Sequence, residues 1–294
     1  MKRNRLVNIT EYTLLRILLS LLRLLPYPVG KKFVTSLFYL IGYLGGVRRE
    51  VAHRQISKVY PQLSSSEVKK LLRKLYHNMG LTVAEIYLLP NKKLLARCKL
   101  SGKEYAEQAF ALGKGAILAT AHYGNWEAAR VLPEFGIPLS VVVKKQHNEL
   151  FDRFNNAIRS QHGLGIIDSR SGLRDIISTF RKNEMLAILA DQNAGHRGHI
   201  LDFLGFPASH HIGVAKLSLH YKVPIVPGFA VREPDGTINF CFEPPIYHPD
   251  WEDNEQNYLR LLSEVNSVIE RYIHKHPEQW FWVHKRWKAT KAMD

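Results

Sequence analysis

The most strand-like run of the chain reads Gly115-Ala116-Ile117-Leu118-Ala119-Thr120-Ala121, and His122-Tyr123-Gly124-Asn125-Trp126-Glu127 follows it without a break. The apolar run predicts a buried strand, and Gly124 with Asn125 predicts a turn and a helix N-cap. A helix is expected over 125–135. His122 is thereby placed at the carboxyl end of a strand and Glu127 on the first turn of the next helix. Reactive groups of α/β proteins collect at such strand ends.

Short apolar runs alternate with amphipathic segments from Gly102 onward. Strands are expected over 116–121, 139–143, 165–167, 185–190, 200–203, 225–231 and 238–242. Helices are expected over 125–135, 149–162, 172–181, 213–221 and 254–276. This alternation predicts an α/β fold with a central, mostly parallel or mixed sheet flanked by helices. The turn Pro234-Asp235-Gly236 makes the last two strands an antiparallel hairpin. Upstream, Ser64 and Glu67 predict a capping box that opens a helix reaching about Leu88.

Two dense apolar segments, 12–25 and 33–47, lie at the N-terminus and are separated by Pro26-Tyr27-Pro28 and Lys31-Lys32. A membrane-spanning helix needs about 20 apolar residues, and neither segment reaches that length. Arg16 and Arg23 project from one helix face, where they would snorkel to lipid phosphates. A signal peptide is disfavoured because no small-x-small cleavage site follows. We predict membrane-associating helices over 1–48 and a catalytic domain over 49–294, with a short single span as the alternative.

The charge of the chain limits its partners. Lys and Arg number 41 against 26 acidic residues, a net charge of +15 in 294 residues. Such a surface favours anionic lipid headgroups, an acidic carrier protein or nucleic acid. No RNA-binding or zinc-finger signature is present, so nucleic acid is not expected, and a basic surface without any partner is the plain alternative. Cys98 and Cys241 are too few for a disulfide framework and indicate a reducing compartment.

His122 and Glu127 form the pair of greatest chemical interest. The loop between them is short enough for Glu127 to accept a hydrogen bond from one imidazole nitrogen, which leaves the other nitrogen as a base. Their spacing alone is weak evidence, because His147/Asp152 and His248/Asp253 repeat it and roughly one such match is expected by chance. Only the first pair joins a strand to a helix through a glycine turn. The alternative is a surface-loop histidine beside a helix-start glutamate.

Four further blocks follow the His-Tyr-Gly-Asn-Trp-Glu segment in order. They are Arg159 in 154–159, Asp191-Gln192, the block 202–208 and the block 277–288. Together they make the chain resemble the bacterial lipid A biosynthesis acyltransferases, the late (secondary) enzymes of the lauroyl or myristoyl type, within the lysophospholipid acyltransferase superfamily. The general motif of the superfamily is His-x4-Asp, and this branch uses Glu. Leu204 and Gln55 depart from the Phe and Asn that the family commonly has.

The resemblance implies a glycerolipid acyltransferase-like fold and a reaction. A fatty acyl chain would pass from acyl carrier protein, or from coenzyme A, directly to a hydroxyl of a lipid A precursor. His122 would be the general base and Glu127 its orienting partner. The backbone N–H groups of Gly124 and Asn125, together with Arg159, are the candidate donors to the tetrahedral oxyanion. Because no Gly-x-Ser-x-Gly elbow is present, a serine acyl-enzyme has little support.

The remaining candidates are substrate-binding or transition-state residues. Asp191 is expected to position substrate or to pair with Arg159, and Gln192, His284 and Arg286 complete the set. No cofactor is expected beyond the acyl donor itself. A metal ion is not expected either, because the four histidines near Asp191 lack a zinc-like spacing. They are His196, His199, His210 and His211.

Two functional alternatives stay open at this point. The acceptor is alternatively a lysophospholipid, a glycolipid or an aminolipid, since such enzymes share the same catalytic residues. A protein of another class would use its positive charge to bind membranes or nucleic acid without catalysis. For the enzyme, the reducing compartment and the positive N-terminus predict a catalytic domain on the cytoplasmic side of a bacterial inner membrane.

Overall fold

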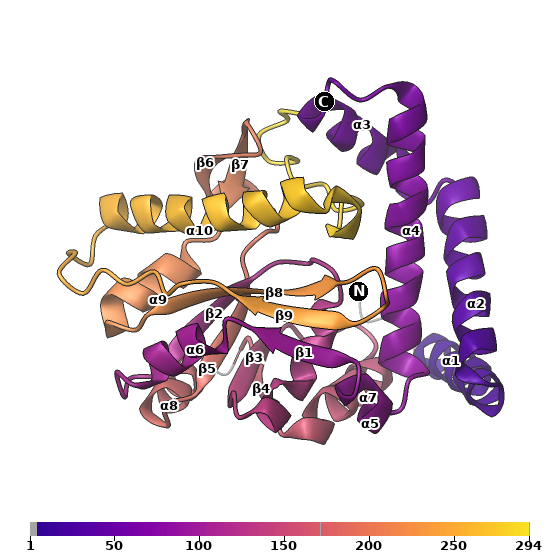
Figure 1. Cartoon of the computed structure of the whole chain (residues 1–294), viewed down its shortest axis with the longest axis horizontal. Coiled ribbons are helices and arrows are strands. Elements are labelled where there is room, and N and C mark those ends of the chain that lie inside the picture. Colours follow the sequence, from indigo (N-terminus) through magenta and orange to yellow (C-terminus); the bar gives the residue numbers. More distant parts are fainter. Residues whose placement is uncertain (1–4, 171, 294) are drawn as a thin grey trace.

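The computed structural model describes residues 5–170 and 172–293. At its centre is a seven-stranded sheet in the order β1-β9-β8-β2-β5-β3-β4 (Figure 1). Its strands are β1 (Cys98–Ser101), β2 (Ala116–Thr120), β3 (Leu139–Val143), β4 (Gly165–Asp168), β5 (Met185–Leu189), β8 (Ile225–Arg232) and β9 (Ile238–Phe242). The pairings are parallel except for the antiparallel hairpin of β8 and β9. The predicted α/β class, its mixed sheet and its hairpin are confirmed.

Helices flank this sheet. The N-terminal part holds α1 (Arg5–Leu24), α2 (Tyr27–Leu37), the π-helix η1 (Phe38–Leu44), α3 (Arg49–Val59) and α4 (Ser65–Tyr87). The rest holds α5 (Asn91–Leu95), α6 (Lys103–Phe110), η2 (Trp126–Phe135), α7 (Glu149–Arg159), η3 (Ser160–His162), α8 (Leu173–Arg181), η4 (Gly195–Arg197), α9 (Gly213–Tyr221), α10 (Glu255–Lys275) and η5 (Pro277–Gln279). The predicted capping box is present, since the Ser64 side chain accepts from the Glu67 amide and the Glu67 carboxylate accepts from the Ser64 amide.

The central strand β2 is buried on both faces, as its apolar sequence requires. Ile117 and Ala119 belong to a core shared with α4, α9 and α10, and with the tryptophans of the C-terminal segment. Ala116 and Leu118 belong to a second core shared with α5, α6 and η2. Alternate residues of a strand point to opposite faces, so β2 contributes to both cores at once. Its carboxyl end is therefore anchored from two sides.

Several elements differ from the sequence predictions. The expected strand 200–203 is β6 (His199–Phe203), which pairs with an unpredicted strand β7 (Phe206–His210) in a separate hairpin. Leu204 and Gly205 form the turn of this hairpin, with φ of 52° and 78°. The sequence around this turn resembles a loop, which is why β7 was not predicted. The predicted helix 125–135 is a 3-10 helix that contains Pro133. Strand β1 and helix α6 were missed, because β1 is only four residues long and half exposed.

The two apolar N-terminal segments form helices, as predicted, and the chain turns between α1 and α2 at Pro26. One side of α1 packs against the protein, where Leu15, Leu19 and Leu22 join a core cluster with residues of α2 and α4. Within the described residues, no helix is both long and apolar enough to cross a membrane. The boundary at residue 48 stays a prediction.

Arg16 and Arg23 of α1 are both exposed and contact groups of the protein, and their contact with lipid phosphates stays a prediction. The Arg23 Nε atom donates to the Tyr87 carbonyl at 2.9 Å. The Arg16 guanidinium donates to the Tyr12 hydroxyl at 2.8 Å and lies over the Phe154 ring, 4.7 Å from its centroid. Because α1 lies against α4 and α7, aromatic rings and carbonyl groups of the protein are within reach of both side chains.

Candidate active site

His122 and Asp191 meet because they follow neighbouring parallel strands. β2 pairs with β5, and just past the strand ends the Ala190 amide donates to the Thr120 carbonyl at 2.9 Å. The Asp191 carboxylate accepts hydrogen bonds from the His122 imidazole Nδ1 at 2.8 Å, the His122 amide at 2.9 Å and the Trp280 indole at 2.9 Å. Asp191 is only 2% exposed. The imidazole is thus oriented by a buried and fully engaged carboxylate.

These contacts assign the tautomer of the imidazole. An ionised Asp191 only accepts, so Nδ1 carries the proton and Nε2 is the basic nitrogen. Nε2 lies 3.2 Å from the side-chain nitrogen of Gln192. Burial lowers the pKa of the His122 imidazole, but Asp191 and the charge of Glu127 outweigh it and the pKa is raised. Burial raises the pKa of Asp191, and the imidazole and Trp280 reverse this, so the net pKa is lowered.

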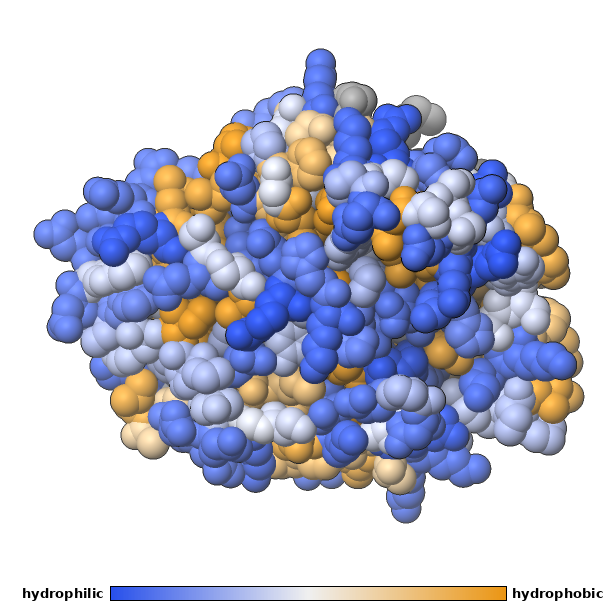
Figure 2. Space-filling view, turned by 45° about the horizontal axis from the view of Figure 1, so that its top comes forward, coloured by the Kyte–Doolittle hydropathy of each residue, from blue (hydrophilic) through white to orange (hydrophobic). Residues whose placement is uncertain are grey.

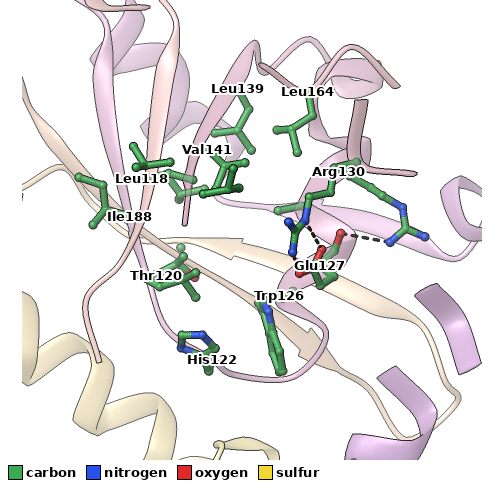
Figure 3. A pocket seen from close by; sticks show the side chains of 18 of the residues that line it. Leu118, Thr120, His122, Trp126, Glu127, Arg130, Leu139, Val141, Leu164 and Ile188 are labelled. Carbon is green, nitrogen blue, oxygen red and sulfur yellow. Dashed lines mark hydrogen bonds and ion pairs between the residues drawn. The ribbon is translucent and has the colours of Figure 1, made fainter. Parts of the chain in front are cut away.

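The structure corrects the predicted hydrogen bond between Glu127 and His122. The Glu127 carboxylate instead forms a two-point ion pair with Arg159 at the end of α7, with Nε–Oε2 and Nη2–Oε1 distances of 2.9 and 2.5 Å. Trp126 packs edge-on against the imidazole at 5.2 Å between ring centroids, and Glu127 points to the other side of the indole (Figure 3). Asp191 accordingly pairs with His122 and not with Arg159.

The backbone amides of Gly124 and Asn125 do not point at a reacting group. They donate to the carbonyl oxygens of Gln279 at 2.9 Å and Ala230 at 3.1 Å, which corrects the predicted oxyanion role. Gly124 has a φ of +55°, and a Cβ atom there would lie 1.9 Å from the Ala230 carbonyl oxygen. Glycine is therefore required for the close approach of this loop to β8. The Asn125 side chain caps η2 by accepting from the Ala128 amide at 3.2 Å.

A buried ionic network beneath the loop was missed by the sequence analysis. Glu85 of α4 is 3% exposed and forms an ion pair with Arg232 of β8, including a 2.9 Å bond from Arg232 Nη2. The Asn125 side chain donates to the same carboxylate at 2.6 Å, and Thr82 donates to the Gly124 carbonyl at 3.2 Å. A glutamate on the apolar face of α4 was the signal available in the sequence. The network fixes the loop that carries His122.

A cavity of about 710 Å³ opens beside the imidazole. His122, Trp126 and Glu127 lie toward one end, and Leu139 and Leu164 lie toward the other (Figure 3). Side chains from β2, β3, β5, β8 and β9 line it, and its depth is apolar. Pockets of this size and character hold most of the surface of an apolar ligand. A base at the mouth of an apolar cavity can activate a hydroxyl group for attack on the carbonyl of a long acyl chain that the cavity holds.

Comparison with known proteins identifies the family of the chain. The family profile described as bacterial lipid A biosynthesis acyltransferase matches residues 1–289. The chain belongs to this family. The lipid A biosynthesis lauroyltransferase of Escherichia coli is 26% identical over 90% of this chain and 87% of that protein. The phosphatidylinositol mannoside acyltransferase of Mycobacterium tuberculosis is 24% identical over 70% of this chain and 66% of that protein. Among solved structures, the 1-acyl-sn-glycerophosphate acyltransferase of Thermotoga maritima aligns with 12% identity and a TM-score of 0.40, covering 87% of this chain and 99% of that one.

Membership of this family makes the chain an acyltransferase and favours catalysis over the binding-protein alternative. The structure shows how the closing block of the sequence, 277–288, is held in the fold. Gln55, the departure in the lead-in, donates to the Trp282 carbonyl at 2.6 Å and the His284 carbonyl at 2.9 Å, and accepts from the Arg286 amide at 3.0 Å. The C-terminal segment is thus attached to α3.

Arg286 takes a structural position in this acyltransferase, which corrects its predicted contact with substrate. The contact of His284 with substrate stays a prediction. His284 Nε2 accepts from the Asn193 amide at 3.1 Å and so supports the loop that carries Gln192. Arg286 is fully buried, donates to the Ser209 carbonyl at 2.6 Å and contacts His210. Burial lowers the pKa of Arg286 to about 10.

The histidines near Asp191 in the sequence lie in different surroundings. Burial and the neighbouring Arg286 lower the pKa of His210 to about 3. His199 forms an ion pair with Glu255 of α10 at 3.0 Å, and His211 lines the mouth of the cavity. Within the described part of the chain, no three potential ligands stand together around a metal site.

Proposed function

We propose that this acyltransferase moves a fatty acyl chain from acyl carrier protein to a hydroxyl group of a lipid A precursor. The observation that carries the proposal is the His122–Asp191 pair at the mouth of the apolar cavity. The hydrogen-bonded pair supplies a base of fixed tautomer, and the cavity accommodates the alkyl chain of the donor. The family and its lauroyltransferase relative support this choice of reaction.

In the proposed step, His122 Nε2 removes the proton of the acceptor hydroxyl as its oxygen attacks the thioester carbonyl. The tetrahedral intermediate collapses by breaking the carbon–sulfur bond, and the thiolate takes the proton back from the imidazolium. Asp191 stays ionised and stabilises the imidazolium between the two transfers. No acyl-enzyme is formed, so the acyl chain passes directly from sulfur to oxygen.

Gln192 takes the place that Gly124 and Asn125 held in the sequence prediction, and Arg159 keeps the place it had there. The acceptor hydroxyl must occupy the position that the Gln192 amide now holds, 3.2 Å from the base. Once displaced, that amide remains close enough to donate to the oxyanion. Arg159, held by Glu127 beside the cavity, adds a positive charge at the same mouth.

We also propose that the N-terminal helices bind the cytoplasmic face of a bacterial inner membrane. Among the described residues, sixteen of the nineteen large exposed hydrophobic side chains fall between Leu6 and Val47. Figure 2 shows apolar residues along the right-hand edge, the side on which Figure 1 places α1 and α2. Exposed apolar surface of this extent marks an interaction site. The net charge of +15 suits both an anionic membrane and an acidic carrier protein.

The acceptor has a second candidate class. The Mycobacterium tuberculosis relative is a phosphatidylinositol mannoside acyltransferase, which favours a glycolipid acceptor as the alternative. Both classes of acceptor would present a lipid hydroxyl group to the base. The geometry at His122 suits either hydroxyl, so the acceptor has to be identified by its mass.

The decisive test compares total lipids of cells with and without the protein by mass spectrometry. The proposal expects one acyl chain to be missing from a lipid A species when the protein is absent. A purified enzyme should then restore that mass with acyl carrier protein as donor and more slowly with coenzyme A. His122→Ala should lower the rate by at least two decades. Unchanged lipids together with a fully active His122→Ala enzyme would refute the proposed function.

A further inference from the structure

A second groove lies between helix α1 and the loop that joins β3 to α7. Its volume is about 640 Å³. Its wall on α1 is formed by Glu11, Tyr12 and Leu15. Its opposite wall is the segment 144–148 together with Phe151 at the start of α7. Lys144 and Gln146 also line the catalytic cavity, so the groove and the cavity meet at these two residues.

We propose that this groove is the entrance and binding site for the anionic lipid acceptor, with its phosphate at Lys144 and its apolar part along Tyr12, Leu15 and Phe151. The inference rests on the proposed function and extends it, because it assigns an acceptor site to the N-terminal helix. In this arrangement α1 is more than an anchor. One of its faces forms the wall of a substrate site that leads from the membrane to His122.

The chemistry of the walls fits an anionic amphiphile. Lys144, Lys145 and His147 lie on the loop and are exposed, whereas Tyr12, Leu15 and Phe151 are partly buried. Lys145 pairs with Glu149 at 2.8 Å, and Glu11 adds a carboxylate on the far wall. Among residues 5–170 and 172–293, no carboxylate lies within ion-pair distance of Lys144. Lys144 is therefore the cation best placed to meet a phosphate at the junction with the cavity.

The groove is held open by fixed contacts. The Asn148 side chain donates to the Asn8 carbonyl of α1 at 2.9 Å and accepts from the Leu150 amide at the start of α7. Further along, Tyr12 packs edge-on against Phe154 of α7 at 6.2 Å between ring centroids. These contacts keep α1 at a set distance from the loop, so the space between them is part of the fold.

The outer surface of α1 shows where the lipid would come from. Leu14, Leu18 and Leu21 are 62%, 38% and 58% exposed. With 3.6 residues per turn, they form a separate exposed stripe on the face next to the packed Leu15, Leu19 and Leu22. A helix resting on the membrane by its outer leucines brings its inner edge, and hence the groove, to the level of the lipid headgroups.

The test uses the full chain on phosphatidylcholine vesicles that contain a photoactivatable phosphatidic acid, with mass spectrometry of the cross-linked peptides. Cross-links are expected on peptides covering 11–15 and 144–151. Lys144→Glu should lower their yield about tenfold, since it removes one positive charge and adds a negative one. The matched control Lys182→Glu makes the same change on the exposed residue that follows α8, and should leave the yield unchanged.

A second pair of variants tests the apolar wall. Leu15→Trp fills the groove and should raise the KM for the lipid acceptor about tenfold, with kcat for saturating substrates unchanged. Leu112→Trp adds the same indole at an exposed position after α6, outside the groove and the N-terminal helices, and should change neither constant. Cross-links confined to other surfaces, or equal in wild type and both groove variants, would overturn the assignment. Because cross-linking needs no acyl transfer, its result stands apart from any failure of the proposed reaction.

Discussion

Asp191→Asn is the most informative single substitution in this enzyme. The carboxylate accepts from His122 Nδ1, the His122 amide and the Trp280 indole, all within 2.9 Å. An asparagine side chain has one acceptor oxygen, which satisfies the backbone amide and the indole, and turns its NH2 group toward Nδ1. Nδ1 must then lose its proton to Nε2. The imidazole keeps its place but presents a donor where the reaction needs a base.

The size of the effect follows from two losses. The charge-assisted hydrogen bond to the imidazolium contributes about 1.5–3 kcal/mol, or one to two decades in rate. The wrong tautomer adds roughly two more decades, so kcat should fall by about 10³ to 10⁴. The assay is single-turnover transfer from a saturating acyl donor. Asp168→Asn, at the exposed end of the edge strand β4, is the matched control and should retain full activity.

The pH dependence gives an independent check. The pKa of His122 is raised in the folded protein, burial being outweighed by Asp191, so the base is lost as pH falls through that raised value. In Asp191→Asn the acidic limb of kcat should move to lower pH. Glu127→Gln should instead lower kcat with a smaller displacement of that limb, because Glu127 contacts Arg159 and not the ring. A folded Asp191→Asn enzyme within about tenfold of wild type would refute the role of Asp191.

Three further predictions concern the frame of the site. Gly124→Ala should lower the free energy of unfolding, measured in urea, by about 3 kcal/mol, because the added Cβ overpacks against the Ala230 carbonyl and φ is positive. Gly136→Ala, where φ is +78° and the surrounding space is open, should lower it by about 1 kcal/mol. Glu85→Gln should lower the free energy of unfolding by about 3–5 kcal/mol, because it leaves Arg232 buried without its partner. Adding Arg232→Met should recover much of that loss. Equal stability of the single and double variants would contradict this. The pKa of His210 is lowered to about 3, mainly by burial, so the unfolded chain binds the extra proton and stability should fall as pH drops from about 6.5 toward 3. His210→Gln should flatten that slope in acid titrations followed by circular dichroism.

The sequence predicted the fold more completely than the site. Strand β2 and its partners were recognisable because their apolar runs are buried on both sides, and the turn Pro234-Asp235-Gly236 identified the hairpin. Strand order was out of reach, because nothing in a local pattern states that β5 lies beside β2 and β3 beside β5. The missing order explains the error at Asp191. Its place after a strand was correct, but its partner depended on which strand was adjacent.

The roles of Gly124, Asn125 and Arg286 were misjudged for a related reason. A glycine turn before a helix suggests free amides, yet these amides bond to Gln279 and Ala230, both more than 100 residues away in the sequence. Arg286 was predicted to bind substrate because arginine is mostly exposed, whereas here it donates to the Ser209 carbonyl in the core. Burial and long-range pairing decide such roles, and a local pattern contains neither.

His122 and Glu127, which their spacing suggested as one pair, therefore belong to two separate pairs. His122 turns back to Asp191 across the sheet, while Glu127 turns outward to Arg159 on α7. α7 connects this second pair to the N-terminus, because Phe154 of the same helix packs against α1. The guanidinium that Glu127 holds lies at the end of this helix. α1 also packs against α4, whose Thr82 and Glu85 fix the loop that carries His122, so both pairings are connected to the N-terminal helix.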